Sequence, residues 1–323
     1  LRYSDIVWKN IVGPHTHARL RRPLSGRQNA PHTEKGERHM NKIKLIALDL
    51  DGTALTPQNK VAETTTDAVR RAREAGVYVA VSTGRICGEA RDFAVDLDAD
   101  DLMVTSGGAT LSSISGEGCT MRMSMPWEAA VRAAAAVERI GMIAMIYVGE
   151  TLLITPYDDL GFGSYKTNEG YLTSKKVVPS VAEYIADHHL SVDKIFVRSQ
   201  DPVTLLRTRA ILEQIPGIRV MSSAADNLEV ITPAADKGTA LGMLCRDIGT
   251  DLDHAAAIGD SENDFEMLRA VALPIAMGNA SSEVKALCRW ETDTNAEDGV
   301  AHAIDRILAH NKACDEQAEN SGI

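Results

Sequence analysis

The sequence lacks paired cysteines, long apolar runs and an excess of positive charge. Its five cysteines are scattered, odd in number and contain no CxxC pair, which argues against a disulfide framework or a zinc site and suits a reducing cytoplasm. No uncharged apolar run approaches the roughly 18 residues that span a bilayer. The net charge of −11 argues against a nucleic-acid surface, because phosphate backbones attract basic proteins. We therefore expect a cytoplasmic protein with neither a membrane nor a nucleic-acid partner.

What is present is ordinary for a globular protein, except at the start. The 323 residues are 44% apolar and 24% charged, and they leave room for two domains. Residues 1–40 hold eight Lys and Arg against three Asp and Glu, a net +5, so the remaining residues carry −16. They contain no apolar segment typical of a secretory signal. We predict that residues 1–40 are a disordered or non-native extension and that Met40 is the true start.

The stretch Lys44–Leu48 is mostly apolar and runs into Asp49-Leu50-Asp51-Gly52-Thr53. A short apolar run bounded by turn residues predicts a strand buried on both faces, as in parallel sheets. Acids at the carboxyl end of such a strand lie where open α/β sheets bind ligands. Asp49 and Asp51 would share a face of a continuing strand, and a hard divalent cation would relieve their repulsion. A turn without any ligand would also explain Asp-Gly-Thr.

Hydrophobic periodicity divides the rest of the chain into α/β and α+β blocks. Helical segments alternate with strand-like segments at 77–81, 102–106, 255–258 and 274–277, which predicts a doubly wound, mostly parallel, Rossmann-like α/β sheet. The intervening block mixes strand pairs and helices in irregular order, which predicts an inserted α+β domain. We therefore predict an α/β core of 41–111 and 229–312, an α+β insert of 112–228, and a polar, frayed tail of 313–323.

Chemically suggestive residues stand at the ends of the predicted core elements: Asp49-x-Asp51, Thr83, Lys237 and Gly259–Asp264. The acid-rich segments each follow a buried strand, so all four could meet at the carboxyl edge of one sheet. Phosphoryl transfer through an aspartate needs such a set, with a carboxylate nucleophile and with hydroxyl, ammonium and metal-binding groups around the phosphoryl oxygens. A second carboxyl can protonate the leaving alkoxide and later deprotonate water. Each segment alone has an ordinary explanation, but their joint occurrence favours catalysis.

On these motifs the chain resembles phosphatases of the haloacid dehalogenase superfamily. It is similar to the Cof-like branch, subfamily IIB, which inserts a cap domain between the second and third motifs, and the resemblance covers residues 42–307. Ala54 and Gly107 stand where the family usually has Leu and Asn, so the resemblance does not extend to the details of specificity. The matching segments are Asp49–Thr53, Ser82–Arg85, Lys237-Gly238 and Gly259–Asp264, followed by the branch's trailing signatures at Ala276–Ala280 and Thr294–Ala301.

The resemblance implies a role for each motif residue. Asp49 would be the nucleophile and a Mg²⁺ ligand, together with Asp260 and the backbone carbonyl of Asp51. Asp51 would also be the general acid and base. Asp264 would orient the water shell of the metal. The phosphoryl group would be held by the backbone N–H of Leu50 and by Thr83, Gly84, Lys237 and Asn263.

The resemblance therefore implies Mg²⁺-dependent hydrolysis of small phosphate monoesters through a phospho-aspartate intermediate. Sugar phosphates are the first expectation and cofactor phosphates the second, and the protein would be a monomer or a homodimer. A phosphomutase of the same branch remains an alternative, which would need a second phosphate site. A non-catalytic phosphate-binding regulator or phospho-aspartate receiver is the other, although the insert and Asp51 count against it. The loops of the insert carry no recognisable code for the leaving group.

Overall fold

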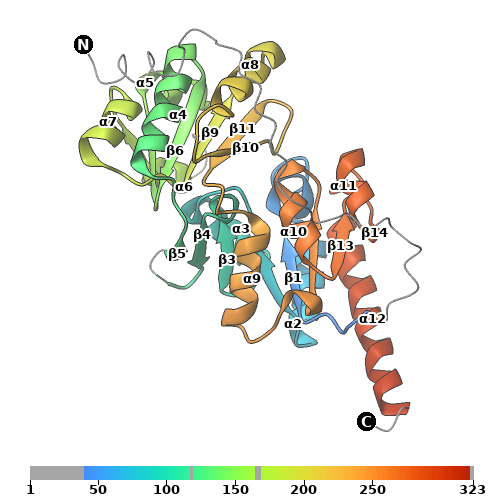
Figure 1. The fold of residues 1–323 in the computed structure, drawn as a ribbon. Coiled ribbons are helices and arrows are strands. Elements are labelled where there is room, and N and C mark those ends of the chain that lie inside the picture. Colours follow the sequence, from blue (N-terminus) through green and yellow to red (C-terminus); the bar gives the residue numbers. More distant parts are fainter. Residues whose placement is uncertain (1–39, 117–118, 164–168, 321–323) are drawn as a thin grey trace, which may run out of the picture.

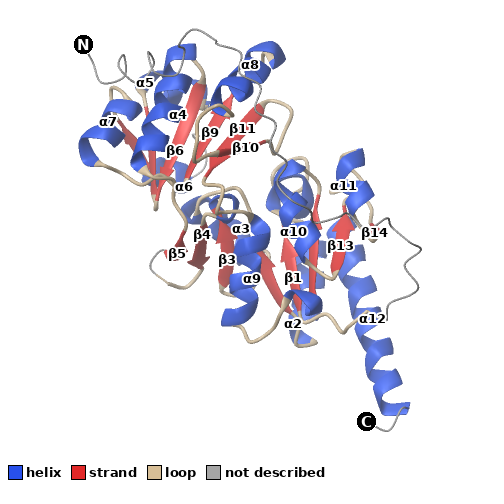
Figure 2. Cartoon of the chain, viewed as in Figure 1, coloured by secondary structure: helices blue, strands red, loops and turns tan. Residues whose placement is uncertain are grey.

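The computed structural model describes residues 40–116, 119–163 and 169–320, so the predicted extension at 1–40, apart from Met40, lies outside the described residues. The described chain forms two bodies that meet at a narrow waist (Figure 1). Each body places strands at its centre and helices around them (Figure 2).

The lower body in Figure 1 is built on a five-stranded sheet in the order β14-β13-β12-β1-β2, with every pair parallel. This confirms the predicted doubly wound α/β core. Its strands are β1 (Leu45–Leu48), β2 (Tyr78–Val81), β12 (Ala255–Gly259), β13 (Leu273–Ala276) and β14 (Trp290–Glu291). Its helices are α2 (Glu63–Glu74), α3 (Cys87–Asp96), α9 (Lys237–Asp247), α10 (Phe265–Ala270), α11 (Ser282–Leu287) and α12 (Gly299–Asn320), with short turns at Leu50–Ala54, Leu252–His254 and Glu262–Asp264.

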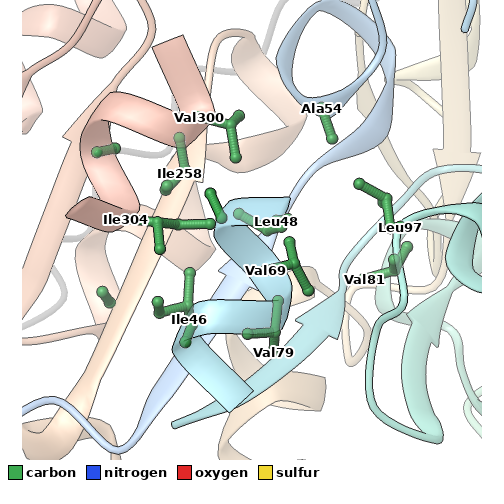
Figure 3. Packing of buried hydrophobic residues seen from close by; sticks show 14 of the residues in the cluster. Ile46, Leu48, Ala54, Val69, Val79, Val81, Leu97, Ile258, Val300 and Ile304 are labelled. Carbon is green, nitrogen blue, oxygen red and sulfur yellow. The ribbon is translucent and has the colours of Figure 1, made fainter. Parts of the chain in front are cut away.

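The central strand β1 is buried on both faces, because its alternate residues enter two different clusters. Ile46 and Leu48 pack with Val69 of α2 and Ile304 of α12 (Figure 3). Leu45 and Ala47, on the opposite face, pack instead against α9, α10 and α11. Burying one large aliphatic side chain contributes about 1.5–3 kcal/mol relative to leaving it exposed, so β1 is strongly fixed in register.

A three-stranded antiparallel sheet extends the core beyond β2. It consists of β3 (Leu102–Thr105), β4 (Thr110–Ser113) and β5 (Cys119–Arg122). A short turn at Ser106–Gly108 lies between β3 and β4. A parallel bridge from Ser82 to Val104 joins β3 to the end of β2. The predicted domain boundary at 112 therefore falls inside β4, a strand that pairs with β3 of the core.

The upper body carries a six-stranded, mostly antiparallel sheet in the order β10-β11-β9-β6-β7-β8 (Figure 1). Helices α4, α7 and α8 pack on one face of it, whereas α5 and α6 lie toward the other. Because β11 pairs with β9 as far as Ile231, the second predicted boundary at 228 also cuts a strand. Its elements are α4 (Trp127–Ile140), β6 (Ile143–Val148), β7 (Thr151–Ile154), α5 (Pro156–Gly161), α6 (Glu169–Ser174), β8 (Lys175–Val177), α7 (Val181–His188), β9 (Lys194–Arg198), α8 (Pro202–Leu212), β10 (Arg219–Met221) and β11 (Asn227–Ile231).

The last helix, α12, continues to Asn320, so residues 313–320 of the predicted tail are helical rather than frayed. Two contacts tie it to the start of the core. The Asn311 side chain bonds both the N–H and the carbonyl of Ile43 at 2.8 Å, and Lys42 pairs with Asp315 at 2.7 Å. Neither α12 nor another helix in the described ranges has the length and apolar character that a membrane span requires.

Candidate active site

The predicted site residues meet because β1, β2 and β12 end side by side. Leu48, at the end of β1, lies opposite Val81 and Ile258. The residues that follow these strands therefore share one edge of the sheet, as the sequence predicts for Asp49, Thr83 and Asp260. Lys237 reaches the same edge as the first residue of α9, whose N-cap is the preceding aspartate, Asp236.

Lys237 joins two carboxylates at the centre of the site. Its Nζ lies 2.6 Å from Asp49 Oδ1 and 2.6 Å from Asp264 Oδ1, and all three side chains are buried. Burial opposes the charge on Lys237, but the two carboxylates outweigh it and raise the lysine's pKa. Burial also raises the pKa of Asp49 well above its usual range, although Lys237 acts against this. The ammonium group thus fixes where the Asp49 carboxylate points.

Asp264 holds the loop that carries Asp260. Its Oδ2 accepts hydrogen bonds from the backbone N–H groups of Asp260 at 3.0 Å and Ser261 at 3.2 Å. A side chain at Gly259 would begin 2.6 Å from the same oxygen, so only glycine fits there. Since its other oxygen binds Lys237, Asp264 holds both the lysine and the Asp260 loop in place. The role predicted for it, orienting the water shell of a metal, stays a prediction.

Three carboxylates could hold a metal ion here. Asp49, Asp260 and Asp264 each offer an oxygen within 4.8 Å of the others. Burial and the nearby charge of Asp264 raise the pKa of Asp260 to about 7, although the Thr53 hydroxyl donates to its Oδ1 at 3.0 Å. A bound cation would relieve this repulsion, and an all-oxygen donor set suits a hard divalent ion. Of the predicted ligands, Asp49 and Asp260 belong to this trio, whereas the Asp51 side chain does not.

The turn at Leu50–Ala54, which follows Asp49, is stabilised by hydrogen bonds from other segments of the chain. Gly52 has a φ of +81°, and a Cβ there would lie 2.5 Å from Asp260 Oδ2, so the turn requires glycine. Asn279 donates to the Gly52 carbonyl at 2.8 Å, and Asn295 donates to the Leu55 carbonyl at 2.8 Å. These asparagines come from the two trailing signatures, which therefore shape the catalytic turn.

The Asp51 side chain lies outside the trio and binds Arg85. The guanidinium donates through Nε at 2.8 Å and through Nη2 at 2.6 Å, one bond to each carboxylate oxygen. Burial alone would raise the pKa of Asp51, but the hydrogen bonds and charge of Arg85 outweigh it, and the pKa is lowered. The sequence contains Arg85 within the second motif, yet sequence reasoning gave it no role.

The remaining predicted phosphate-binding groups also follow the ends of β1, β2 and β12. Thr83 is fully buried, and its Oγ1 accepts a hydrogen bond from the backbone N–H of Arg85 at 3.2 Å. Asn263 lines the cavity described below, and its Oδ1 accepts from the Ser261 hydroxyl at 2.9 Å. The side chain of Leu50 is buried in the core, so only its backbone could bind a ligand. Of the two departures from the family pattern, Ala54 lies in this core (Figure 3).

A cavity of about 210 Å³ lies between the two bodies, above Asp49. The upper body supplies most of its wall through alternate residues of β6, β9 and β11, which all project from one face of the sheet. This alternation was the only available signal for these residues, and sequence reasoning assigned none of them to a site. The wall consists of Asp49, Asp51, Gly84, Arg85, Glu89 and Asn263 from the core and Met145, Tyr147, Lys194, Phe196, Arg198, Ser223, Ala224, Asp226, Asn227 and Glu229 from the insert.

Direct contacts hold the insert over the core at this cavity. Lys194 donates to the Gly84 carbonyl at 2.6 Å and forms a buried ion pair with Glu229 at 3.0 Å. A Cβ on Gly84 would lie 2.9 Å from the lysine Nζ, so a side chain there would push the end of Lys194 aside. Ile86 of the core is buried in a cluster of the insert that includes Tyr147, Phe196 and other apolar side chains.

Glu262 of the fourth motif also contacts the insert. Its Oε2 accepts from Arg209 at 2.9 Å and from the backbone N–H of Ser222 at 3.1 Å. The insert is thus fastened to the core through the loops of the second and fourth motifs.

Comparisons with known proteins agree with this arrangement. A family model described as haloacid dehalogenase-like hydrolase matches residues 46–304. The 5-amino-6-(5-phospho-D-ribitylamino)uracil phosphatase YcsE of Bacillus subtilis is 30% identical over 268 residues, which cover 81% of this chain and 94% of that protein. An HMP-PP phosphatase of Shigella boydii is 27% identical over 256 residues, covering 75% of this chain and 91% of that protein.

A solved structure of a haloacid dehalogenase-like hydrolase from B. subtilis has the same fold. It matches with a TM-score of 0.72 and 26% identity, over 81% of this chain and 99% of that one. The family match spans the core, the insert and all four motifs, and the motif residues converge on one sheet edge. The chain therefore belongs to the haloacid dehalogenase-like hydrolase family.

Proposed function

We propose that this protein is a Mg²⁺-dependent phosphatase that hydrolyses small phosphate monoesters through a phospho-aspartate intermediate. The observation that carries the proposal is the buried Asp49 carboxylate at the floor of the cavity, held at 2.6 Å by Lys237. The relatives whose printed names are phosphatases support the same reaction class. We also propose that the insert is a cap domain, running from about residue 123 to residue 231 according to the strand pairing.

In the first step, an Asp49 oxygen forms a bond to phosphorus while the bond from phosphorus to the leaving oxygen breaks. Lys237, the Thr83 hydroxyl, the Asn263 amide and the backbone N–H groups of Leu50 and Gly84 would bind the phosphoryl oxygens. A Mg²⁺ ion held by Asp49, Asp260 and the Asp51 carbonyl would supply further positive charge at those oxygens.

Asp51 would give a proton to the leaving oxygen and later take one from the water that attacks the phospho-aspartate phosphorus. That second attack breaks the bond to the Asp49 oxygen and releases inorganic phosphate. The lowered pKa of Asp51 beside Arg85 supports the second role, because an ionised carboxylate accepts a proton. For the first role we propose that the negative charge of the bound phosphoryl group raises the pKa of Asp51 while its pairing with Arg85 is kept.

The charges of the cap wall count against the phosphomutase alternative. A mutase must bind a second phosphate, and free cations are the usual ligands of that group. Each cationic side chain on the described cavity wall is already paired with a carboxylate: Arg85 with Asp51, Lys194 with Glu229, and Arg198 with Asp226 at 2.8 Å. We therefore propose esters with one phosphate, such as sugar phosphates, over bisphosphates.

A phosphate-release assay on purified protein tests the proposal. We expect turnover of p-nitrophenyl phosphate and of a panel of sugar and cofactor phosphates with Mg²⁺, and loss of turnover with EDTA. Restored turnover on adding Mg²⁺ back would exclude damage by the chelator. Absence of hydrolysis across the whole panel with Mg²⁺ present would contradict the proposal, as would undiminished turnover in EDTA.

A further inference from the structure

Glu89 is a buried acid on the cavity wall that the proposed reaction does not use. It lies in the first turn of α3, its side chain is 3% exposed, and it lines the cavity beside Arg85. Its Oε1 is buried and has no hydrogen-bond partner within the described ranges of the chain. An unpaired buried polar atom costs about 1–3 kcal/mol, so an oxygen left unpaired at a cavity wall indicates a ligand group.

The surroundings of Glu89 restrict the charge of that group. Burial raises the pKa of Glu89, while the nearby charges of Arg85 and Lys194 lower it and that of Asp51 raises it. A cationic ligand group would be repelled by Arg85 and Lys194. An anionic one would be repelled by Asp51 and by Glu229. A hydroxyl group avoids both penalties. It can donate to an ionised carboxylate or accept from a protonated one, so it fits Glu89 in either state.

The neighbouring wall suits the carbon skeleton of the same leaving group. Tyr147 and Phe196 present rings from adjacent strands, and Lys194 Nζ lies 5.3 Å and 5.6 Å from their centroids. Rings of this kind offer flat apolar surface, while Arg198 and Asn227 offer polar groups at the cap end of the cavity. Apolar faces between polar edges match a carbon chain or ring that carries several hydroxyl groups.

We propose that Glu89 is a specificity-determining residue that binds a hydroxyl group of a neutral, polyhydroxylated leaving group. This inference rests on the proposed phosphatase function and adds the substrate class that the cavity selects. Glu89 takes no part in bond breaking, since Asp51 and Asp49 serve the reacting atoms. Its effect should therefore depend on whether the ester carries a hydroxyl.

Three esters separate this role from a structural one: ribitol 5-phosphate, pentyl phosphate, which has the same chain length without hydroxyls, and p-nitrophenyl phosphate. We expect Glu89→Leu to lower kcat/KM for ribitol 5-phosphate by about 10- to 100-fold, mostly through KM, because the hydroxyl loses its partner. For the other two esters, kcat/KM of this variant should change by less than about threefold. Glu89→Gln, which keeps the shape and one acceptor, should recover part of the loss.

Asp92→Asn is the matched control, because Asp92 is an exposed acid of the same helix. This variant should have the same kcat/KM as the parent protein for all three esters. Melting temperatures of the variants should show that each is folded. An equal loss on all three esters, or an unchanged preference between ribitol 5-phosphate and pentyl phosphate in both Glu89 variants, would overturn the proposal. Failure of the parent protein to hydrolyse any ester is a separate result, which would overturn the proposed function itself.

Discussion

Each of the two bodies buries one lysine beside the cavity, and the two lysines are held differently. Lys237 has both of its carboxylate partners, Asp49 and Asp264, inside the core at 2.6 Å. Lys194 has one partner in its own sheet, Glu229, and one across the gap, the Gly84 carbonyl. The surroundings of Lys237 therefore stay the same whether or not the bodies separate, whereas those of Lys194 change. This contrast fits the proposal that the core supplies the constant chemistry and the cap the variable selection.

The largest effect should come from breaking the core side of this comparison. Asp49→Asn removes the nucleophile and its charge, and we expect loss of at least about 10⁴-fold in turnover for every ester. Measurement of kcat with p-nitrophenyl phosphate checks this, with the melting temperature as a control for the lost bond to Lys237. Activity within tenfold of the parent protein would refute the nucleophile assignment.

Asp51→Asn should cost less and should depend on the leaving group. We expect kcat/KM for a sugar phosphate to fall by about 10²–10⁴-fold, because the alkoxide must be protonated as it leaves. The loss in kcat/KM for p-nitrophenyl phosphate should be smaller, since nitrophenolate leaves without a proton. Equal losses for both esters would place the role of Asp51 elsewhere, for example in holding Arg85.

On the cap side, Lys194→Met should act on binding more than on chemistry. We expect about a tenfold fall in kcat/KM for sugar phosphates, because the contact to Gly84 that closes the cavity is lost. Small p-nitrophenyl phosphate, which buries little against the cap, should lose less. Lys176→Met is the matched control, since Lys176 is an exposed lysine of the cap. A purely structural role for Lys194 predicts instead the same loss for both esters.

A smaller effect is expected from the acidic trio of Asp49, Asp260 and Asp264: the thermal stability of the protein should depend on both pH and Mg²⁺. The pKa of Asp260 is about 7 in the folded protein against an ordinary 3.8, so the folded state keeps a proton that the unfolded state has lost. Stability of the metal-free protein should therefore fall as pH rises between these values. Mg²⁺ binds the ionised form of Asp260. The rise in Tm of the protein on adding Mg²⁺ should therefore be larger at about pH 8 than at about pH 5. Asp260→Asn should remove the difference.

Deleting residues 1–39 should have the smallest effect. The segment lacks the periodicity of a core element, so we expect the melting temperature and kcat/KM to stay unchanged. Thermal unfolding of the truncated and full chains checks this directly. A fall of several degrees would mean that the segment packs on one of the two bodies.

The sequence predicts the core side well, because its chemistry lies at strand ends marked by compact motifs. Asp49, Thr83, Lys237 and Asp260 converge as those motifs indicate. The cap side could not be predicted in the same way. Lys194 and Glu229 are ordinary strand residues until β9 and β11 pair in register and turn them to one face. The predicted boundaries at 112 and 228 fall inside β4 and β11 for the same reason, since pairing between distant strands decides where a sheet ends.

The burial of Ile86 within the aromatic cluster of the cap has a thermal consequence. If the bodies separate to release product, the Ile86 side chain and the rings around it pass from an apolar contact into water. Exposure of apolar surface carries a positive change in heat capacity, and its free energy therefore curves with temperature. The closed fraction should pass through a maximum and decline on both cooling and heating. Where cap opening limits turnover, an Arrhenius plot of kcat should bend without any unfolding of the protein.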